Sequence, residues 1–415
     1  LQNRFADGGA IGSAVFFDPT RPVRIDTSAY MGYYEWSDLT RPKLLAARNP
    51  VSLLNNKFDE SNVNRFIGNA LFDFAIPNFN NLHLFLNIGA DYAKGAGTVI
   101  IDSNAAVKFI NPGLGKSKGG GVNNKYENTR TNQLIDAYFN YKGELRNLLS
   151  EFDFTGGYSF QKWSNSSPNF PDLNQRGDTT AKPAPFPFYT DNALMSFYSR
   201  LNYTFLDNYL LTASLRADGS SRFSPDNRWG LFPSLALAWR MTDLSFVRAI
   251  PSVSNLKLRA GWGITGQQDG IGDYAWIANY SYSDSASQYQ FGNNFLPMLR
   301  PQGFDANLKW EESKSINVGI DFGLFKNRLN GTIDFYKKWT YDLLSVIPTQ
   351  AGTNFTDNIL TNVGNLENQG VELNINWIAL DQIGRNLELG FNATWNQTKI
   401  TKLSKVPDGS QGILV

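Results

Sequence analysis

The sequence predicts an all-β chain whose strands form a transmembrane, antiparallel, up-and-down β-barrel with long loops on one side. About twelve stretches of roughly ten residues alternate apolar and polar side chains, and the links between them alternate short and long. Alternation with a period of two gives a strand two unlike faces. Tilted strands of this length span about 25 Å, the height of the apolar band on an outer-membrane barrel. Aromatic residues make up 14% of the chain, as a barrel with rings facing lipid would require.

The clearest alternation starts at Phe197. Leu201 and Tyr203 fall on one face of the predicted strand, whereas Arg200 and Asn202 fall on the other. A Lys or Arg on the lipid face would cost about 2–4 kcal/mol at the bilayer midplane, so we expect the polar face to line a wet lumen. A soluble sandwich with one face in water would show the same alternation. The strand lengths and the asymmetry of the links favour the membrane barrel.

The expected strands come in pairs, and most pairs are joined by a short link rich in the residues that hairpin turns require. The pairs are Phe66–Ile76 with Leu82–Tyr92, Leu134–Glu144 with Phe152–Gln161, Phe197–Leu206 with Tyr209–Asp218, Trp229–Arg240 with Leu256–Ile264, Ser313–Phe322 with Leu329–Tyr341, and Gly370–Trp377 with Leu387–Gln397. The longest link within a pair, Asp243–Ser254, is expected to contain a short helical turn at residues 244–247.

The links between pairs are long, and all of them fall on the same side of the sheet. They are Ala93–Gln133, Lys162–Met195, Gly219–Arg228, Thr265–Glu312 and Asp342–Gln369. Outer-membrane barrels have short periplasmic turns and longer extracellular loops, which predicts that these links are extracellular. Soluble sandwiches show no such regular difference between their two ends.

The composition excludes several classes of function. Lys and Arg number 38 and Asp and Glu 37, so no basic excess indicates nucleic-acid binding. Cysteine is absent and His83 is the only histidine, which excludes thiolate sites, histidine-based zinc sites and Ser-His-Asp triads within this chain. No apolar run reaches the roughly 18 residues of a membrane helix. We expect neither an enzyme nor a metal or cofactor site.

The long link Thr265–Glu312 contains the candidate substrate-binding residues. Its aromatic rings lie among amides, hydroxyls and carboxylates, which suits sugar or peptide recognition by stacking and hydrogen bonding. The candidates are Asp269, Asp273, Tyr274, Trp276, Tyr280, Tyr282 and Tyr289. The alternative is that these rings pack the loops against one another or against a partner protein. Asp269 and Asp273 do not have the spacing of a calcium loop, and a structural turn explains them more simply.

Five blocks of sequence resemble the barrel of SusC/RagA-type TonB-dependent transporters. They are Tyr209–Phe223, Asn227–Arg240, Leu256–Gln267, Asn307–Glu311 and Asn362–Glu372. Pro19–Val23 and Asn64–Asn69 look like earlier blocks of the same family, so the likeness covers nearly the whole chain. We interpret the blocks as structural: Gly219 with Ser220-Ser221-Arg222 sets loop geometry, and Asn365 to Gly370 sets the start of a strand.

The resemblance implies an outer-membrane barrel of about 22 strands plugged by an N-terminal domain. It also implies active import of oligosaccharides or peptides, powered through TonB, with a SusD-like lipoprotein as an extracellular lid. The sequence shows no TonB box, no plug and no terminal strand ending in an aromatic residue. We therefore expect residues 1–415 to be a partial barrel domain surrounded by outer-membrane lipid, with TonB reached through a missing N-terminal region.

Two alternatives stay open at this point. A passive porin would share the barrel pattern and would need neither plug nor TonB box. A soluble β-rich carbohydrate-binding or adhesion protein would share the alternation and the aromatic loops, and it would fractionate without detergent.

Overall fold

The structure, a computed structural model, describes residues 9–38, 41–43, 45–79, 81–109, 120–184, 186–283, 287–349, 352, 356–402 and 404. The chain divides into two compact units. Unit 1 comprises residues 1–68, 90–132 and 163–191, and unit 2 comprises residues 69–89, 133–162 and 192–415. Each unit is described separately.

Among the described residues, twelve strands form one sheet, and unit 2 contains part or all of each of them. The strands follow one another in chain order, and the pairs from β7 to β20 are antiparallel. The twelve strands are β1 (Lys57–Ala75), β2 (Leu82–Ile101), β3 (Val122–Leu145), β4 (Ser150–Ser167), β7 (Phe188–Phe205), β8 (Tyr209–Ser220), β9 (Trp229–Arg240), β10 (Val253–Gln267), β15 (Glu311–Leu324), β16 (Leu329–Tyr341), β19 (Asn365–Gln382) and β20 (Arg385–Lys402). All twelve predicted strands are confirmed.

The first four strands, and also β7, β19 and β20, are longer than the alternation predicted. Strand β3 has 24 residues and begins at Val122, whereas the sequence pattern indicated a start at Leu134. The expected links Ala93–Gln133 and Lys162–Met195 are therefore longer than the links in the structure, because strand residues occupy both of their ends. The pattern fails there because a strand that continues beyond the apolar band keeps its backbone ladder but no longer needs one lipid-facing side.

The register of the sheet places the apolar residues of neighbouring strands directly opposite one another. Leu258 on β10 lies between Trp239 on β9 and Ile320 on β15. The same row continues across the sheet through Phe205, Tyr209, Trp239, Leu258, Ile320, Ile333, Leu373 and Ala393. Directly opposed residues share a face, so this row belongs to a continuous apolar face. The predicted two-faced sheet is confirmed.

The opposite face, called the polar face below, contains charges that neutralise one another. Arg259 Nη2 lies 2.7 Å from Asp321 Oδ1 and 3.0 Å from Asp334 Oδ1. Gly319 is directly opposite Arg259, and a Cβ there would lie 2.2 Å from Asp334 Oδ1. Glycine at this position leaves room for the guanidinium to reach both carboxylates across two strands.

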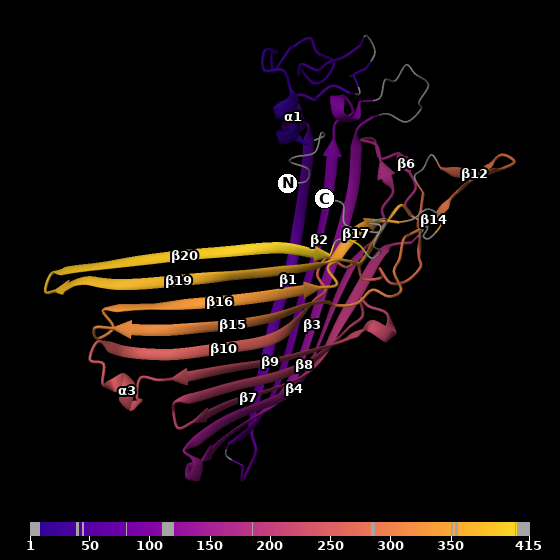
Figure 1. Cartoon of the computed structure of the whole chain (residues 1–415). Coiled ribbons are helices and arrows are strands. Elements are labelled where there is room, and N and C mark those ends of the chain that lie inside the picture. The colour runs from indigo at the N-terminus through magenta and orange to yellow at the C-terminus, as the bar shows by residue number, and fades with distance from the viewer. Residues whose placement is uncertain are drawn as a thin grey trace. The chain divides into compact units, whose positions relative to one another are not determined.

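The two ends of the sheet in unit 2 differ, as the link lengths predicted. Helix α3 (Ser245–Arg248) lies in the link between β9 and β10, where the helical turn was expected. Figure 1 shows α3 at one end of these strands, whereas β14 and β17 lie at the other end. The short strands of the long loops are β11 (Tyr280–Tyr282), β12 (Gln288–Phe291), β13 (Asn294–Pro297), β14 (Leu299–Pro301), β17 (Leu344–Pro348) and β18 (Asn358–Asn362).

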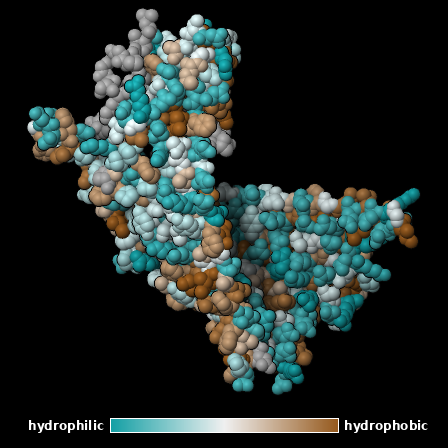
Figure 2. Space-filling model, turned by 180° about the vertical axis from the view of Figure 1, so that it is seen from behind, coloured by the Kyte–Doolittle hydropathy of each residue, from teal (hydrophilic) through white to brown (hydrophobic). Residues whose placement is uncertain are grey.

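Large hydrophobic side chains remain exposed on the strands. Val318 is 48% exposed and Trp262 42% exposed, although both lie on long, well-paired strands. On the surface seen in Figure 2, hydrophobic residues gather in patches between hydrophilic areas. Contiguous apolar patches of this kind mark surfaces that another apolar phase or a partner covers. Within the described part of the chain, no helix combines the length and the apolar character needed to cross a membrane.

Unit 1 contains residues 57–68 of β1, 90–101 of β2, 122–132 of β3, 163–167 of β4 and 188–191 of β7. It also contains α1 (Ala10–Phe16), α2 (Pro50–Asn55), β5 (Asp172–Leu173) and β6 (Thr179–Ala181). The Asn49 side chain accepts hydrogen bonds from the backbone N–H groups of Val51 and Ser52, which caps α2. Burial raises the pKa of the Glu35 carboxyl above its usual range, although the Asn49 N–H and the Arg48 charge oppose this shift.

The two faces of the sheet predict opposite responses at adjacent positions. Val318→Lys, in the middle of β15 on the apolar face, should cost about 2–4 kcal/mol because an ammonium group would meet hydrocarbon. Asn317→Lys, one residue earlier on the polar face, should cost about 1 kcal/mol or less, as substitutions away from special features do. The measurement is the urea midpoint of the protein folded into lipid vesicles. Equal midpoints for the two variants would contradict the assignment of the faces.

Candidate functional site

A hydrophobic cluster lies beneath the long loops at the end of the sheet opposite α3. Phe223, Phe232, Ile271, Leu308 and Trp310 are all buried, with 0% to 8% exposure, and this set is called the rim cluster. Trp310 packs against Phe223 at a centroid distance of 5.0 Å and against Phe232 at 5.4 Å. Its indole Nε1 donates to the Arg228 carbonyl at 3.0 Å. The cluster therefore ties the loop after β8 to residues on both ends of the long loop 268–310.

The Ser220 turn, residues 220–222, joins the end of β8 to the start of loop 268–310 through side-chain hydrogen bonds. Ser220 Oγ donates to Gln268 Oε1 and accepts from the Arg222 backbone N–H at 3.2 Å. A Cβ on Gly219 would lie 2.9 Å from the Trp229 ring, so only glycine fits under that ring. These contacts agree with the interpretation of Gly219 and Ser220-Ser221-Arg222 as determinants of loop geometry.

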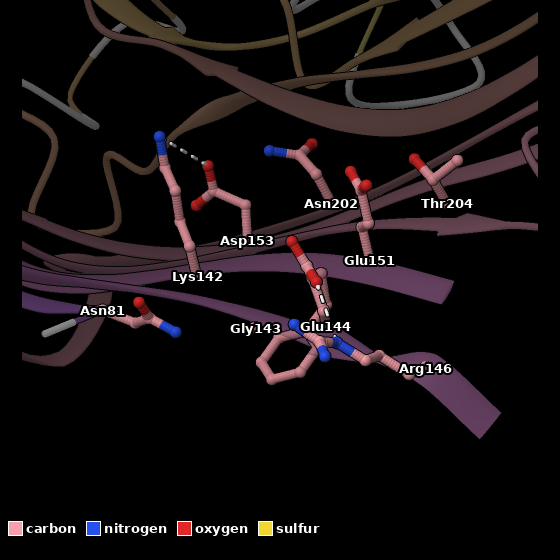
Figure 3. A pocket seen from close by; sticks show the side chains of 10 residues that line it. Asn81, Lys142, Gly143, Glu144, Arg146, Glu151, Asp153, Asn202 and Thr204 are labelled. Carbon is pink, nitrogen blue, oxygen red and sulfur yellow. Dashed lines mark ion pairs between the residues drawn. The ribbon is translucent and has the colours of Figure 1, made fainter. Parts of the chain in front are cut away.

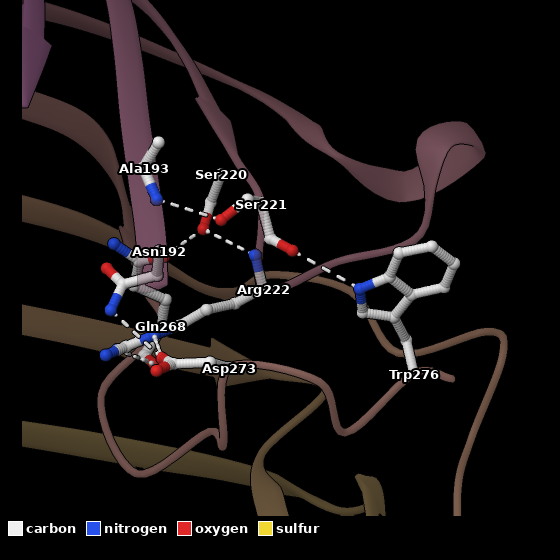
Figure 4. Close-up of polar contacts among 8 residues, drawn as sticks. All are labelled: Asn192, Ala193, Ser220, Ser221, Arg222, Gln268, Asp273 and Trp276. Carbon is white, nitrogen blue, oxygen red and sulfur yellow. Dashed lines mark hydrogen bonds and ion pairs between the residues drawn. The ribbon is translucent and has the colours of Figure 1, made fainter. Parts of the chain in front are cut away.

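Asp273, a predicted substrate ligand, is held by two partners from other segments. Its Oδ1 accepts from Asn192 Nδ2 at 3.0 Å and from Arg222 Nε at 3.2 Å. The Asp273 side chain is 15% exposed and the Arg222 side chain 22% exposed. Figure 4 shows the three side chains converging from β7, from the Ser220 turn and from loop 268–310. The carboxylate thus anchors the loop to the sheet, and one edge of this ion pair is open to solvent.

Trp276 lies close to the same anchor. Its indole Nε1 donates to the Ser221 carbonyl at 3.2 Å, and the ring is half-buried. Ser221 in turn accepts from the Ala193 N–H through Oγ at 2.9 Å. Figure 4 shows Trp276 on the other side of the Ser220 turn from Asp273. The structure therefore brings Asp273 and Trp276 to one turn, which spacing alone did not reveal.

Three of the remaining aromatic candidates lie on the short strands β11 and β12 of the same loop and are exposed. Tyr280 is 64% exposed, Tyr282 40% and Tyr289 55%. Tyr280 and Tyr282 are two residues apart on β11, so both lie on the same side of that short strand. Tyr289 on β12 lies 6.4 Å from the Phe291 ring. Asp269 is exposed in the turn after β10, and Tyr274 is 37% exposed.

A polar cavity of about 700 Å³ lies at the short-link end of β3, β4 and β7. Figure 3 shows Lys142, Glu151, Asp153 and Asn202 along its wall, with Lys142 Nζ 4.0 Å from Asp153 Oδ2. Glu144 and Arg146 form a second ion pair at 3.7 Å. Positively and negatively charged side chains are mixed along the wall. The cavity therefore offers a polar surface to water rather than a binding site for anions or for cations alone.

These sites offer aromatic rings, amides, hydroxyls and carboxylates, which suit recognition by stacking and hydrogen bonding. No cluster of three or more His, Asp or Glu side chains that could hold a metal ion occurs among the described residues. Sequence reasoning missed Asn192, the partner of Asp273, and Gln268, the partner of Ser220. Gln268 directly follows the family-like block Leu256–Gln267, whereas Asn192 lies outside all the blocks and carries no signal in the sequence.

Comparison with known proteins identifies the family. Residues 11–412 match the family described as TonB dependent receptor-like, beta-barrel. The chain is 36% identical to the TonB-dependent receptor SusC of Bacteroides thetaiotaomicron over 97% of this chain and 41% of that protein. It is also 38% identical to the TonB-dependent receptor P39 of Formosa agariphila, over 52% of this chain and 20% of that protein.

Solved structures agree on the fold. The RagAB peptide importer in its closed-closed state superposes with a TM-score of 0.73 at 21% sequence identity, over 89% of this chain and 39% of that chain. Its open-open state gives a TM-score of 0.72. The chain thus spans about two fifths of SusC and of the RagAB chain. The two-faced sheet with its asymmetric ends is part of an outer-membrane barrel wall, and the chain belongs to the TonB-dependent receptor β-barrel family.

Proposed function

We propose that the complete transporter containing this chain imports oligosaccharides or peptides across the outer membrane, driven through TonB and assisted by a SusD-like lipoprotein. The observation that carries the proposal is 36% identity to SusC over 97% of the chain. The likeness to a structure named as a peptide importer supports the peptide half of the substrate range. The family is one of transporters rather than enzymes, so the binding surfaces above serve transport.

Within that protein, we propose that residues 1–415 form part of the barrel domain. The apolar face of the sheet would meet outer-membrane lipid, and the polar face with Arg259, Asp321 and Asp334 would line the lumen. TonB would act on a region outside this chain. A passive porin is the competing function, and it differs in needing no energy source.

We propose further that loop 268–310 contacts the substrate. Tyr280, Tyr282 and Tyr289 present exposed rings on short paired strands, and rings held in this way stack on sugars or on peptide planes with little loss of side-chain freedom. Asp269 and Tyr274 lie nearer to the sheet on the same loop. The anchor formed by Asp273, Trp276 and Arg222 would hold the base of the loop while its outer strands bind.

Dependence on TonB separates active import from a porin. Deleting the gene should abolish growth on one class of polymer, glycan or peptide, and the wild-type gene should restore it. Deleting TonB in the complemented strain should abolish uptake of the same labelled polymer again. The readout is the initial rate of uptake with each polymer class. Import that persists without TonB would instead support the porin.

The aromatic loop can be tested by a combined substitution. The triple variant Tyr280→Ala, Tyr282→Ala, Tyr289→Ala should weaken binding at least about tenfold, because each ring contact contributes about 0.5–1.5 kcal/mol. Calorimetry with the purified transporter and the imported polymer measures the affinity. Phe79→Ala is the matched control, since Phe79 is 62% exposed in a short link on the opposite side. Equal losses in the triple variant and in the control would contradict a role for this loop.

Asp273 allows loop anchoring to be separated from direct substrate contact. If the carboxylate acts by holding Arg222 and Asn192, then Asp273→Ala and Arg222→Gln should weaken binding to a similar extent, and the double variant should add little. Limited proteolysis of loop 268–310 should speed up in both single variants. A loss of affinity in Asp273→Ala with neither faster proteolysis nor an effect of Arg222→Gln would instead show direct contact with substrate.

A further inference from the structure

A row of eight directly opposed residues crosses the polar face from β7 to β20, and none of the eight carries a charge. Each residue is the register partner of the next. The eight are Asn202, Thr212, Ala236, Gly261, Asn317, Tyr336, Gly370 and Asn396, and this set is called the neutral belt. Directly opposed residues share a face, so the whole belt lies on the side of the sheet that carries Arg259 and Asp334.

The neutral belt rises along the wall as it crosses the strands. Asn202 lies three residues before the end of β7, which a short link follows, whereas Asn396 lies eleven residues after the start of β20, which a short link precedes. Short links mark the periplasmic end of an outer-membrane barrel. The belt therefore leads from the periplasmic end of the wall toward the extracellular loops, in the direction that an imported molecule must cover.

Charged side chains occupy the rows on both sides of the belt. The adjacent row toward the short links contains Arg259, Asp334 and Glu372. The adjacent row toward the long loops contains Arg200 and Lys338. The belt is thus a neutral strip between two charged rows on the same face.

Tyr336 is the one aromatic residue of the belt, and its side chain lies along the wall. A Cβ on Gly370, the residue opposite it on β19, would lie 2.6 Å from Tyr336 Oη and 2.7 Å from Tyr336 Cζ. The end of the ring therefore lies over the Gly370 backbone, where only glycine leaves room for it. Tyr336 is half-buried, so part of the ring covers the sheet and part remains accessible from the polar face.

Amide side chains flank this ring on both sides. Asn317 lies directly opposite Tyr336 on β15, and Asn396 lies directly opposite Gly370 on β20. Gly261 follows Asn317 in the belt, and no atom of the described residues lies within 4 Å of the position of an added Cβ there, so a ligand can approach the backbone. An amide both donates and accepts hydrogen bonds, as a sugar hydroxyl does.

We propose that the neutral belt is a track that binds a neutral oligosaccharide on its way through the lumen. One sugar ring stacks on Tyr336, and its hydroxyls form hydrogen bonds with Asn317 and Asn396. A peptide carries charged termini and charged side chains, for which the belt offers no group of opposite charge. The inference rests on the proposed import function and narrows its substrate range to glycans.

Uptake by cells that express the complete transporter tests the substrate class. The cells receive neutral oligosaccharides prepared from plant, algal and bacterial polysaccharides together with peptides of similar mass, and mass spectrometry follows the depletion of each from the medium. Wild-type cells should deplete an oligosaccharide and no peptide, and only when TonB is present. Depletion of peptides alone would overturn the track and leave the import function intact. Depletion of neither class would overturn both.

Two substitutions test the track itself. Tyr336→Leu and Asn317→Leu should each lower the maximal rate of oligosaccharide uptake about twofold to tenfold, the size of one ring contact or one hydrogen bond. The half-saturating concentration should stay unchanged, because binding at the extracellular loops precedes the track. Thr332→Leu is the matched control, since Thr332 lies on β16 and on the polar face but outside the belt.

Heat-modifiable migration on gels measures the amount of folded transporter, to which each rate is normalised. Tyr336→Phe keeps the ring and should retain most of the wild-type rate. Normalised rates for Tyr336→Leu and Asn317→Leu equal to that of Thr332→Leu would overturn the track. Asn317→Leu remains decisive if Tyr336→Leu does not fold, because it leaves the ring in place over Gly370.

Discussion

The backbone hydrogen-bond ladder is the constraint on which the rest of this structure depends. Hydrocarbon offers no partner for an N–H or a C=O, so each strand that spans a membrane must find all its partners on neighbouring strands. The unbroken pairing of β15 with β16, from Glu312 opposite Tyr341 to Leu324 opposite Leu329, is the local form of that constraint. Because the pleat has a period of two, a shift by one residue would turn every apolar side chain to the wrong face.

The rim cluster solves a second problem, which is how to end such a sheet beneath long loops. At this end of β8, β9 and β15 the regular strand pairing stops. Without the cluster, nothing would fix the conformation of the links that follow or precede these strands. Trp310 and Phe223 bury their rings together. Hydrogen bonds donated by Trp310, Ser220 and Arg222 hold the links around them. The family-like blocks Tyr209–Phe223, Asn227–Arg240 and Asn307–Glu311 therefore include the rim residues Phe223, Phe232, Leu308 and Trp310 as well as strand residues. This leaves the outer strands of loop 268–310 free to present different side chains without disturbing the wall.

The candidate site shows where prediction from sequence succeeds and where it stops. Rings and carboxylates in loop 268–310 could be recognised as a group because they are close in the chain. Their division into an anchor with Asp273 and Trp276 and an exposed set with Tyr280, Tyr282 and Tyr289 could not. Arg222 reaches Asp273 across 51 residues and Asn192 reaches it across 81. Contacts at such separations follow from strand order and register, which no local pattern contains.

The sequence by itself determined the strands of the wall, their two faces and the end at which the long loops lie. These properties are local, because the side-chain period of a strand and the chemistry of a hairpin turn are set by adjacent residues. Tertiary structure alone decided how far β3 continues beyond the apolar band, which residues close the rim, and which partners hold Asp273 and Trp276. Those properties depend on which residues separate strands and loops bring together, and only the assembled register specifies that.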